Sequence, residues 1–521
     1  MKNSLLKGFT YLALGSLLAK LFGGIYKILL TNVLGGQNIG VYQQLLPVYA
    51  FAVVLVSAGV PLGVSKMMAN VDESKKAIAL KSTFILFFVY STFLAIIMAM
   101  LSKSIAKGQG NEYFWFAYCI LSPAVVLSSL SAVFKGYFQS LQNFKPTAIS
   151  NIFEQISKIV FSIGVIVLFV SSSRGQIAVA ITGILVGEFS CFVALLYMKK
   201  QLDKSLNNVA SIDKKSKTKF TFADFMSFAK HIAKNVLPIM LTGLVLPFSN
   251  LIDSFLVVRL LNNNFSVDKS IYLYGLQTGV VGAIINVPTT ITFAFISVLM
   301  PTLSKNFVSG DEKQFSYKFR LAYKSILAIT IPCFLFLLVY PNSIINLIYG
   351  SNLNAYNMNG QMISSTLLLW SSFNVVFSCL ATFFSMCLQA RNNRVMPIIN
   401  SIIGVAVKLL LEIIFVPTSN ISILAFTIAG VIGNLTILTL NYYLLKRENI
   451  GFIKTVELLK IILCSTIVLT ISLLLGTIGL TNTSFVIIGL FSVIMYLILC
   501  WKLKIFSRQE LHFLSKSKTN T

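Results

Sequence analysis

Ionisable side chains interrupt stretches of this sequence that are otherwise almost entirely apolar. Glu154 and Lys158 form an acid–lysine pair four residues apart, and Lys408 and Glu412 form another. A charge at the centre of a bilayer costs about 2.5–3.5 kcal/mol on insertion scales, so such side chains normally face a protein interior or an aqueous cavity. The other ionisable side chains inside the apolar stretches are Lys20, Lys27, Glu188 and Asp253. The pattern predicts a polar path through a membrane protein, which is typical of a carrier.

Two lysines share the first apolar stretch. Lys20 and Lys27 are seven residues apart, which places them on one face of a helix and about 10 Å apart along its axis. A lysine near the end of a span can extend its ammonium group to the membrane surface. Lys20 lies about eleven residues into the stretch that begins at residue 9, so we expect it to face a cavity. Both lysines are candidate substrate-binding residues.

The two acid–lysine pairs allow two interpretations. They either contribute to a substrate site or neutralise each other within the helix bundle, as i,i+4 pairs can. Glu188 and Asp253 have no such neighbour on their own helical faces. Each therefore requires a lysine from another helix, a bound cation or a proton, and we predict both as ion-coupling residues.

Composition identifies the class of protein. The chain has 521 residues, of which 56% are hydrophobic and only 11% are charged, a balance typical of polytopic membrane proteins. Since a span needs about 20 apolar residues, we predict an all-α polytopic membrane protein with about fourteen transmembrane helices. Their approximate ranges are 9–31, 42–65, 82–102, 113–134, 147–170, 176–198, 235–258, 273–300, 322–340, 362–387, 396–416, 421–444, 461–479 and 484–501.

Positive charge is distributed unevenly around these spans. With a cytoplasmic N-terminus, most of the 42 Lys and Arg residues fall in cytoplasmic segments, which is the positive-inside pattern. We therefore predict that both termini are cytoplasmic. The net charge of +26 is explained by this topology and by anionic lipid headgroups, so no nucleic-acid partner is expected. Lys66 and Lys135, near the inner ends of spans, are predicted to line a cytoplasmic mouth that favours an anionic substrate.

Other kinds of chemistry have little support. The seven cysteines lie in apolar stretches and the two histidines are isolated, so neither a metal site nor a redox motif is predicted. The sequence has no glycine-rich phosphate loop and no nucleophile–base motif. We expect a protein that is not an enzyme and has no cofactor, apart from sodium ions or protons used for coupling.

A polar segment at 199–233 separates six predicted spans from eight. Residues 141–158 resemble residues 388–408, and residues 61–66 resemble residues 301–305, in both cases with an offset of six spans. An even offset gives both copies the same orientation, which predicts two six-helix lobes related as parallel pseudo-repeats. The predicted domains are an N-terminal lobe at 1–198, a basic cytoplasmic linker at 199–233, a C-terminal lobe at 234–445, and two further helices with a cytoplasmic tail at 446–521.

Several blocks resemble the polysaccharide-exporter family that includes stage V sporulation protein B. They are residues 16–27, 40–43, 57–66 and 134–155, and the most specific is Lys135-Gly136-Tyr137-Phe138-Gln139. The resemblance implies the fold of lipid II flippases and of multidrug and toxin extrusion antiporters, with two six-helix lobes that alternate access. The two extra helices are a feature of the sporulation and lipid II branches.

The resemblance also implies a substrate and a location. The substrate would be an undecaprenyl-diphosphate-linked oligosaccharide, such as lipid II or a related envelope precursor, which crosses the bacterial cytoplasmic membrane from the inner to the outer leaflet. Lys20 and Lys27 resemble the basic first-helix segment that lines the cavity of lipid II flippases, although Ile28 follows Lys27 where those proteins have an acid. Asp253 is similar to an acid that helps to bind sodium in some relatives.

The sequence leaves alternatives open. A cation-coupled antiporter for small organic molecules is one, and a membrane scaffold for cell-wall or spore-cortex synthesis is another. A membrane-bound glycosyltransferase has less support, because Glu112 and Asp268 are the only acids in the predicted outer loops. The expected partners are the lipid-linked sugar diphosphate, membrane lipids and proteins of cell-wall synthesis.

Overall fold

The computed structural model describes residues 2–209, 225–230, 232, 236, 240, 243–391, 393, 395–418, 422–448, 450–476, 481–507 and 510. Within these ranges the secondary structure is helical, apart from a single isolated bridge between Ala355 and Met358. Twelve of the described helical segments are long and apolar enough to cross a membrane. This confirms the prediction of an all-α polytopic membrane protein.

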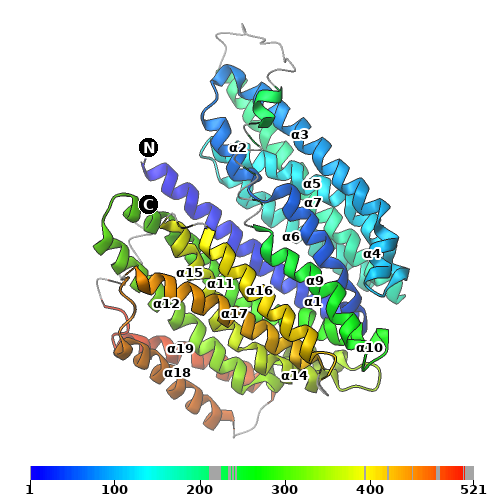
Figure 1. Ribbon diagram of the computed structural model, residues 1–521, viewed down its shortest axis with the longest axis vertical. Helices are drawn as coiled ribbons and strands as arrows, with labels where there is room; N and C mark the ends of the chain where they lie inside the picture. Colours follow the sequence, from blue (N-terminus) through cyan, green and yellow to red (C-terminus); the bar gives the residue numbers. More distant parts are fainter. Residues whose placement is uncertain are drawn as a thin grey trace. The chain divides into compact units, whose positions relative to one another are not determined.

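The chain packs as two units, one of residues Leu5–Gly275 and one that begins at Leu276 and also includes the residues before Leu5. Helices of the first unit surround a core of apolar side chains from its own spans. They are α1 (Lys2–Ser57), α2 (Val60–Ala69), α3 (Glu73–Met100), α4 (Ser102–Gly108), η1 (Glu112–Phe114), α5 (Trp115–Ser140), α6 (Lys145–Phe169), α7 (Ser173–Val209), α9 (Val245–Leu261) and α10 (Val267–Gly275) (Figure 1).

The second unit begins with a π-helical turn, η2, which continues directly from α10. Its helices pack around a core rich in phenylalanine, to which α11, α12 and α15 contribute. They are η2 (Leu276–Val281), α11 (Gly282–Val308), α12 (Glu312–Val339), α13 (Pro341–Tyr349), η3 (Gly350–Leu353), α14 (Gly360–Ser371), α15 (Phe373–Ala390), α16 (Val395–Phe415), α17 (Ser422–Arg447), α18 (Thr455–Gly476) and α19 (Asn482–Lys502).

Glycines separate the first predicted spans. α1 is much longer than a single span, but Gly35 within it has φ 71° and ψ 174°, which interrupts the helix. A second break occurs at Gly59, where φ is 74°, directly before α2 and its early proline, Pro61. Positive φ is available to glycine without steric cost. The two predicted spans 9–31 and 42–65 therefore correspond to two helical stretches inside α1, the second continued by α2.

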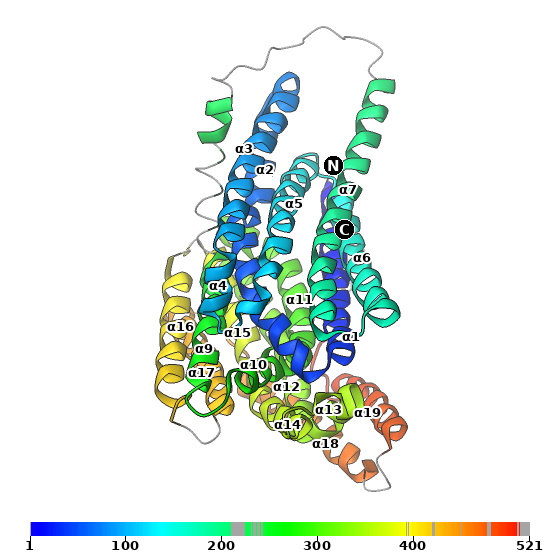
Figure 2. The same ribbon diagram turned by 90° about the vertical axis from the view of Figure 1, so that its right-hand side faces the viewer.

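The helix α7 is longer than a span requires. Its 37 residues extend about 55 Å at 1.5 Å per residue, whereas the hydrocarbon core of a bilayer is about 30 Å thick. Figure 2 shows α7 extending well past the end of its neighbour α6. The beginning of the predicted linker, up to Val209, is thus a continuation of this helix. Residues 210–224 of the predicted linker lie outside the described residues.

The predicted spans correspond closely to the observed helices. Because Gly35 interrupts α1, the first of the twelve apolar segments contains two predicted spans. The predicted span 235–258 corresponds to α9, and most of its first ten residues lie outside the described ranges. The total of fourteen spans stays a prediction.

A buried amide network fastens α9 to the first unit. Gln44 of α1 and Gln109, which follows α4, exchange hydrogen bonds from each side-chain Nε2 to the other's backbone carbonyl, at 2.6 and 2.9 Å. Gln109 Nε2 also donates to Ser254 Oγ of α9 (3.2 Å), and Tyr118 donates to Gln109 Oε1. Buried amides are costly unless they are hydrogen-bonded. Packing thus places α9 with the first six spans, while the predicted boundary at 199–233 between two lobes stays a prediction.

Backbones approach closely where glycines meet in the first unit. A Cβ atom added at Gly40 of α1 would lie 2.4 Å from the carbonyl oxygen of Ile271, and one at Gly275 would lie 2.3 Å from the Cα of Gly40. In contrast, a Cβ atom added at Gly24, also in α1, would meet nothing within 4 Å. The crossing of α1 and α10 therefore requires glycine on both helices.

We expect Gly40→Ala to destabilise the protein and Gly24→Ala to leave its stability unchanged or slightly higher. The new methyl group at residue 40 would press on a backbone carbonyl, and overpacking of this kind costs about 1–3 kcal/mol. Thermal unfolding of both variants in one detergent measures the difference. An unchanged unfolding midpoint for Gly40→Ala would contradict the close crossing of α1 and α10.

Candidate functional site

Four of the predicted charged residues gather in the first unit. Lys135 comes from α5, Glu154 and Lys158 come from α6, and Glu188 comes from α7. Each of the two acids acts electrostatically on both lysines. Two acids are thus matched by two lysines, and such groups offset one another when they are ionised in a site of low dielectric constant. We refer to these four residues as the acid–lysine cluster.

A tyrosine from α1 completes one side of the acid–lysine cluster. The hydroxyl group of Tyr49 donates a hydrogen bond to Glu188 Oε1 at 3.0 Å. On the other acid, Gln155 Nε2 donates to Glu154 Oε1 at 2.9 Å. Hydrogen bonds to an ionised acceptor are stronger than those between neutral groups. Sequence reasoning missed Tyr49, because a tyrosine in an apolar span gives no signal of its partner 139 residues away.

The first half of α1 reaches the same cluster through Tyr26, the residue before Lys27. The ammonium group of Lys158 lies 4.8 Å from the centre of the Tyr26 ring, within the range of a cation–π interaction. The Tyr26 hydroxyl group donates to Ser162 Oγ at 3.2 Å. Lys158 therefore contacts an aromatic face and is also attracted electrostatically by the two carboxylates.

A glycine allows α7 to lie directly against the charged face of α6. A Cβ atom added at Gly187 would be 3.0 Å from the backbone oxygen of Glu154 and 3.3 Å from Lys158 Cβ. One turn earlier, a Cβ atom at Gly183 would be 1.8 Å from Ser162 Oγ. Larger residues at either position would separate the helices and pull Glu188 away from its partners.

The segment of α1 that carries Lys20 and Lys27 also lies along α6. Gly23 stands between the two lysines, and a Cβ atom added there would be 3.3 Å from Gln155 Oε1. The Lys20 side chain is exposed and Lys27 is half-buried. Both lysines therefore lie on a stretch of helix beside Glu154, and their role in substrate binding stays a prediction.

The second unit contains the other predicted pair. Lys408 Nζ lies 3.6 Å from Glu412 Oε1, and the Glu412 side chain is fully buried. The ring of Phe426 on α17 lies 5.7 Å from the same ammonium group. This is a direct ion pair within one helix. In the described part of the chain no such direct contact joins Glu154 to Lys158, which instead share the four-residue cluster.

The two pairs have similar surroundings. A Cβ atom added at Gly433 of α17 would be 2.9 Å from Lys408 Cβ, just as Gly187 of α7 faces Lys158 of α6. Spans 5 and 6 thus have the same glycine-against-lysine contact as spans 11 and 12. This contact agrees with the predicted repeat and its offset of six spans.

The remaining predicted residues lie in different surroundings. Asp253 is buried on α9, next to Ser254 of the amide network. Among the described residues, the charged groups that act on Glu188 are Glu154, Lys135 and Lys158, so the two predicted ion-coupling acids do not share a site.

Lys66 is exposed in the last turn of α2, where a cation stabilises the negative end of the helix dipole. Lys135, the other residue predicted at the cytoplasmic mouth, belongs instead to the acid–lysine cluster by its interactions. A mouth lined by these two lysines stays a prediction.

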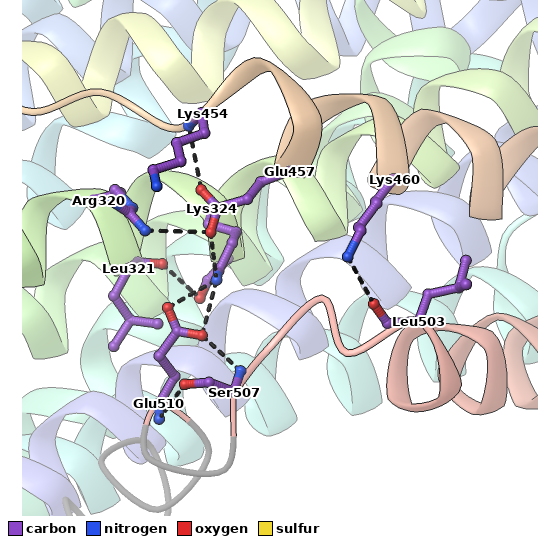
Figure 3. Close-up of polar contacts among 10 residues, drawn as sticks. Arg320, Leu321, Lys324, Lys454, Glu457, Lys460, Leu503, Ser507 and Glu510 are labelled. Atoms are coloured by element: carbon purple, nitrogen blue, oxygen red, sulfur yellow. Dashed lines mark hydrogen bonds and ion pairs between the residues drawn. The ribbon is translucent and has the colours of Figure 1, made fainter.

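A further charge network lies in the second unit (Figure 3). Lys324 of α12 is only 1% exposed, and its ammonium group lies 2.8 Å from both carboxylate oxygens of Glu510 and 3.4 Å from Glu457 Oε1. Arg320, one turn earlier, lies 3.4 Å from the same oxygen of Glu457. We call these four residues the Lys324 network. Sequence reasoning missed both acids, because each lies in a polar stretch where charge is ordinary.

An apolar pocket of about 880 Å³ adjoins this network. Its walls come mainly from α12, α18 and α19, and nearly all of the atoms that line it are apolar. Ser325, the neighbour of Lys324, lines the pocket, as does Phe506, whose ring lies 5.2 Å from Lys324 Nζ. The pocket thus has a cation beside one part of its wall.

Comparison with known proteins gives a family match over more than half of the chain. Residues 5–307 match the model described as "Polysaccharide biosynthesis protein". The chain is 22% identical over 472 residues to "Lipid II flippase MurJ" of Bacillus subtilis (strain 168), which covers 86% of this chain and 84% of the relative. It is 22% identical over 455 residues to "Stage V sporulation protein B" of the same organism, with 83% and 82% covered. These matches confirm the resemblance inferred from the sequence blocks.

Solved structures show the same fold. A lipid II flippase MurJ in an inward closed conformation superposes with a TM-score of 0.72 at 17% identity, and covers 95% of this chain and 98% of that chain. An inward-facing multidrug resistance MATE family transporter of the MOP superfamily gives a TM-score of 0.62 at 13% identity, with 83% and 94% covered. At these identities the similarity establishes the fold.

The balance of charge in the acid–lysine cluster leads to a test. We expect Lys135→Gln and Glu188→Gln each to destabilise the protein, by up to about 3–5 kcal/mol, because each change leaves an uncompensated charge in the cluster. The double variant should recover most of this loss. Unfolding in detergent measures all three, with the exposed Lys200→Gln on α7 as the control. Additive losses in the double variant would show that the two residues do not balance one another.

Proposed function

Since this chain belongs to the polysaccharide biosynthesis protein family, we propose that it is a flippase for an undecaprenyl-diphosphate-linked oligosaccharide. Lipid II or a related envelope precursor would move from the inner to the outer leaflet by alternating access. The observation that carries the proposal is similarity over nearly the whole chain, in sequence and in fold, to lipid II flippases. No enzymatic step is part of the proposal.

The charged residues within the spans fit a substrate that carries a diphosphate. Lys20 and Lys27 lie on one stretch of α1, beside the residues of α6 that belong to the acid–lysine cluster. Ammonium groups bind phosphate oxygens through charge-assisted hydrogen bonds. We propose that these two lysines bind the diphosphate, while the acid–lysine cluster and the Lys408–Glu412 pair each hold together helices of their own unit.

The apolar pocket of the second unit supports a lipid as the substrate. A site of about 880 Å³ with almost wholly apolar walls suits part of a hydrocarbon chain and offers little to a sugar. We propose that this pocket receives part of the undecaprenyl chain. The oligosaccharide would then need a polar environment elsewhere in the protein.

We propose that both termini face the cytoplasm, that Lys66 and Lys135 assist entry from that side, and that the protein resides in the bacterial cytoplasmic membrane.

The membrane supplies an energy source. An anion that leaves a cell with a negative interior gains about 2.3 kcal/mol per charge at 100 mV. Ion coupling would add to this through Asp253 or Glu188. Proteins of cell-wall synthesis are the expected partners.

An antiporter for small molecules is the second candidate, and the fold similarity to a MATE family transporter favours it. The two functions differ in what crosses the membrane. Purified protein in liposomes that contain fluorescent lipid II distinguishes them: a flippase makes the headgroups accessible on the outer leaflet, whereas an antiporter moves small organic cations and leaves the headgroups where they were.

We expect the double variant Lys20→Ala, Lys27→Ala to reduce lipid II flipping at least about tenfold, which corresponds to roughly 1.4 kcal/mol of lost phosphate binding. Neither change removes a span, so membrane insertion should be normal. Lys200→Ala, a lysine on the exposed part of α7, serves as the control for loss of positive charge. Normal flipping by the double variant would exclude both residues from the mechanism.

Asp253 provides a separate test of ion coupling. Asp253 is buried on α9, where binding of a cation or a proton would change the local charge. We expect Asp253→Asn to change the sodium or pH dependence of flipping more than it changes the affinity for lipid II. Transport is measured in liposomes with imposed sodium and proton gradients. Wild-type flipping that is insensitive to sodium, pH and potential would contradict a coupling role for Asp253.

A further inference from the structure

The chain turns back sharply after α19. Lys504 adopts a left-handed conformation with φ 49°, and the N–H group of Ile505 donates to the carbonyl oxygen of Cys500 at 3.0 Å. A hydrogen bond from the sixth residue back to the first, with a left-handed residue between them, is typical of a Schellman motif at a helix end. Lys460 of α18 donates to the carbonyl oxygen of Leu503 at 3.3 Å. The end of α19 is thus tied to α18, and the residues that follow are directed towards α12.

Two reciprocal hydrogen bonds then fix the position of Glu510. The backbone N–H of Ser507 donates to Glu510 Oε2 at 2.7 Å, and the backbone N–H of Glu510 donates to Ser507 Oγ at 3.2 Å. This is the geometry of a capping box. The carboxylate of Glu510 is therefore held in place before it meets Lys324, and its contact is not that of a freely moving terminal side chain.

The acid is held in its ionised form. Burial alone would raise the pKa of Glu510, but the hydrogen bonds from Lys324 and Ser507 outweigh burial and hold the pKa below its ordinary value. Within the Lys324 network, Lys324 and Arg320 offset Glu457 and Glu510. Removal of Glu510 alone would leave one positive charge in excess beside the apolar pocket.

The contact lies at the wall of that pocket. The ring of Phe506, which lines the pocket, lies 5.2 Å from Lys324 Nζ, and Ser325, the neighbour of Lys324 on α12, lines the pocket as well. An amphiphile with an anionic head and an apolar chain would match this combination, with its head on Lys324 and its chain in the pocket. A carboxylate and a phosphate both present anionic oxygens that an ammonium group can bind.

We propose that residues 503–507 and Glu510 form a latch on this lipid site. The carboxylate of Glu510 occupies on Lys324 the position that the phosphate of a polyisoprenyl lipid takes when its chain enters the pocket. A phosphate group on Lys324 replaces the negative charge that Glu510 withdraws, so Lys324 and Arg320 keep an anionic partner besides Glu457 when a phosphate-headed lipid opens the latch. This inference rests on the proposed function, because it takes the lipid to be either the transported substrate or the polyisoprenyl carrier of that substrate.

Binding of geranylgeranyl diphosphate to the full-length protein in detergent tests the latch, with geranylgeraniol as the probe that lacks phosphate. We expect Glu510→Gln to bind the diphosphate about five- to tenfold more tightly, since one competing charge-assisted hydrogen bond is removed. Lys324→Gln should bind the diphosphate and the alcohol alike. The matched control is Glu312→Gln, an acid at the start of α12 whose ion pair is with Arg391. Unchanged or weaker binding by Glu510→Gln overturns the proposal.

Hydrogen exchange in the wild-type protein gives a second test that needs no variant. We expect geranylgeranyl diphosphate to accelerate exchange in the peptide that contains residues 503–510, and geranylgeraniol to have no such effect. Equal acceleration by phosphatidylglycerol would show that any phosphate-headed lipid opens the latch, which overturns the assignment to polyisoprenyl lipids. No acceleration by any lipid overturns the latch itself.

The flipping assay separates this inference from the proposed function. If the wild-type protein flips lipid II and Glu510→Gln shows no gain in binding, only the latch is wrong. If lipid II is not flipped but geranylgeranyl diphosphate still accelerates hydrogen exchange in the peptide that contains residues 503–510, the latch is correct and the proposed function is wrong. The lipid site would then serve a purpose other than flipping. The two outcomes require different measurements and cannot be mistaken for one another.

Discussion

The cost of an ionised group in a medium of low dielectric constant determines how the helices of each unit are arranged. In the first unit, two carboxylates and two ammonium groups from α5, α6 and α7 offset one another. In the second, Lys408 faces Glu412 within a single helix, and Lys324 is balanced by acids from outside α12. Displacement of one helix alone would leave a charge without its counter-ion, so the helices that share a cluster are expected to move together.

Glycine provides the space that these charges need. A lysine on one helix can lie against a neighbouring helix only where the neighbour has no side chain, as at Gly187 and Gly433. Each glycine lies on the helix that follows the helix of its lysine, and the same kind of contact occurs in both units. The contact thus combines a packing requirement with an electrostatic one, and a single substitution at either glycine would disturb both.

Hydropathy was sufficient to predict the spans, because hydrocarbon requires long apolar helices whatever their packing. The charged members of the acid–lysine cluster were also predictable, since an acid such as Glu188 is conspicuous among apolar residues. Their partners were not. Tyr49 resembles any other aromatic residue of a span, and Glu510 lies in a charged terminal region, so neither contact could be inferred without the fold. The break at Gly35 depends on a local φ angle that composition does not report.

Two described residues before α9 pack in the same unit as α7. Ile232 and Val236 are buried with Val60 and Val64 in one cluster of the first unit. The described residues on both sides of 210–224 thus belong to one unit, whereas the division between Gly275 and Leu276 falls inside the continuous helical run from α10 through η2 to α11. For a flexible loop, doubling the length costs only about 0.6 kcal/mol of closure entropy. A reporter domain inserted between residues 209 and 225 would therefore join two ends that belong to the same unit, and it would leave the helical run at the division between the units uninterrupted.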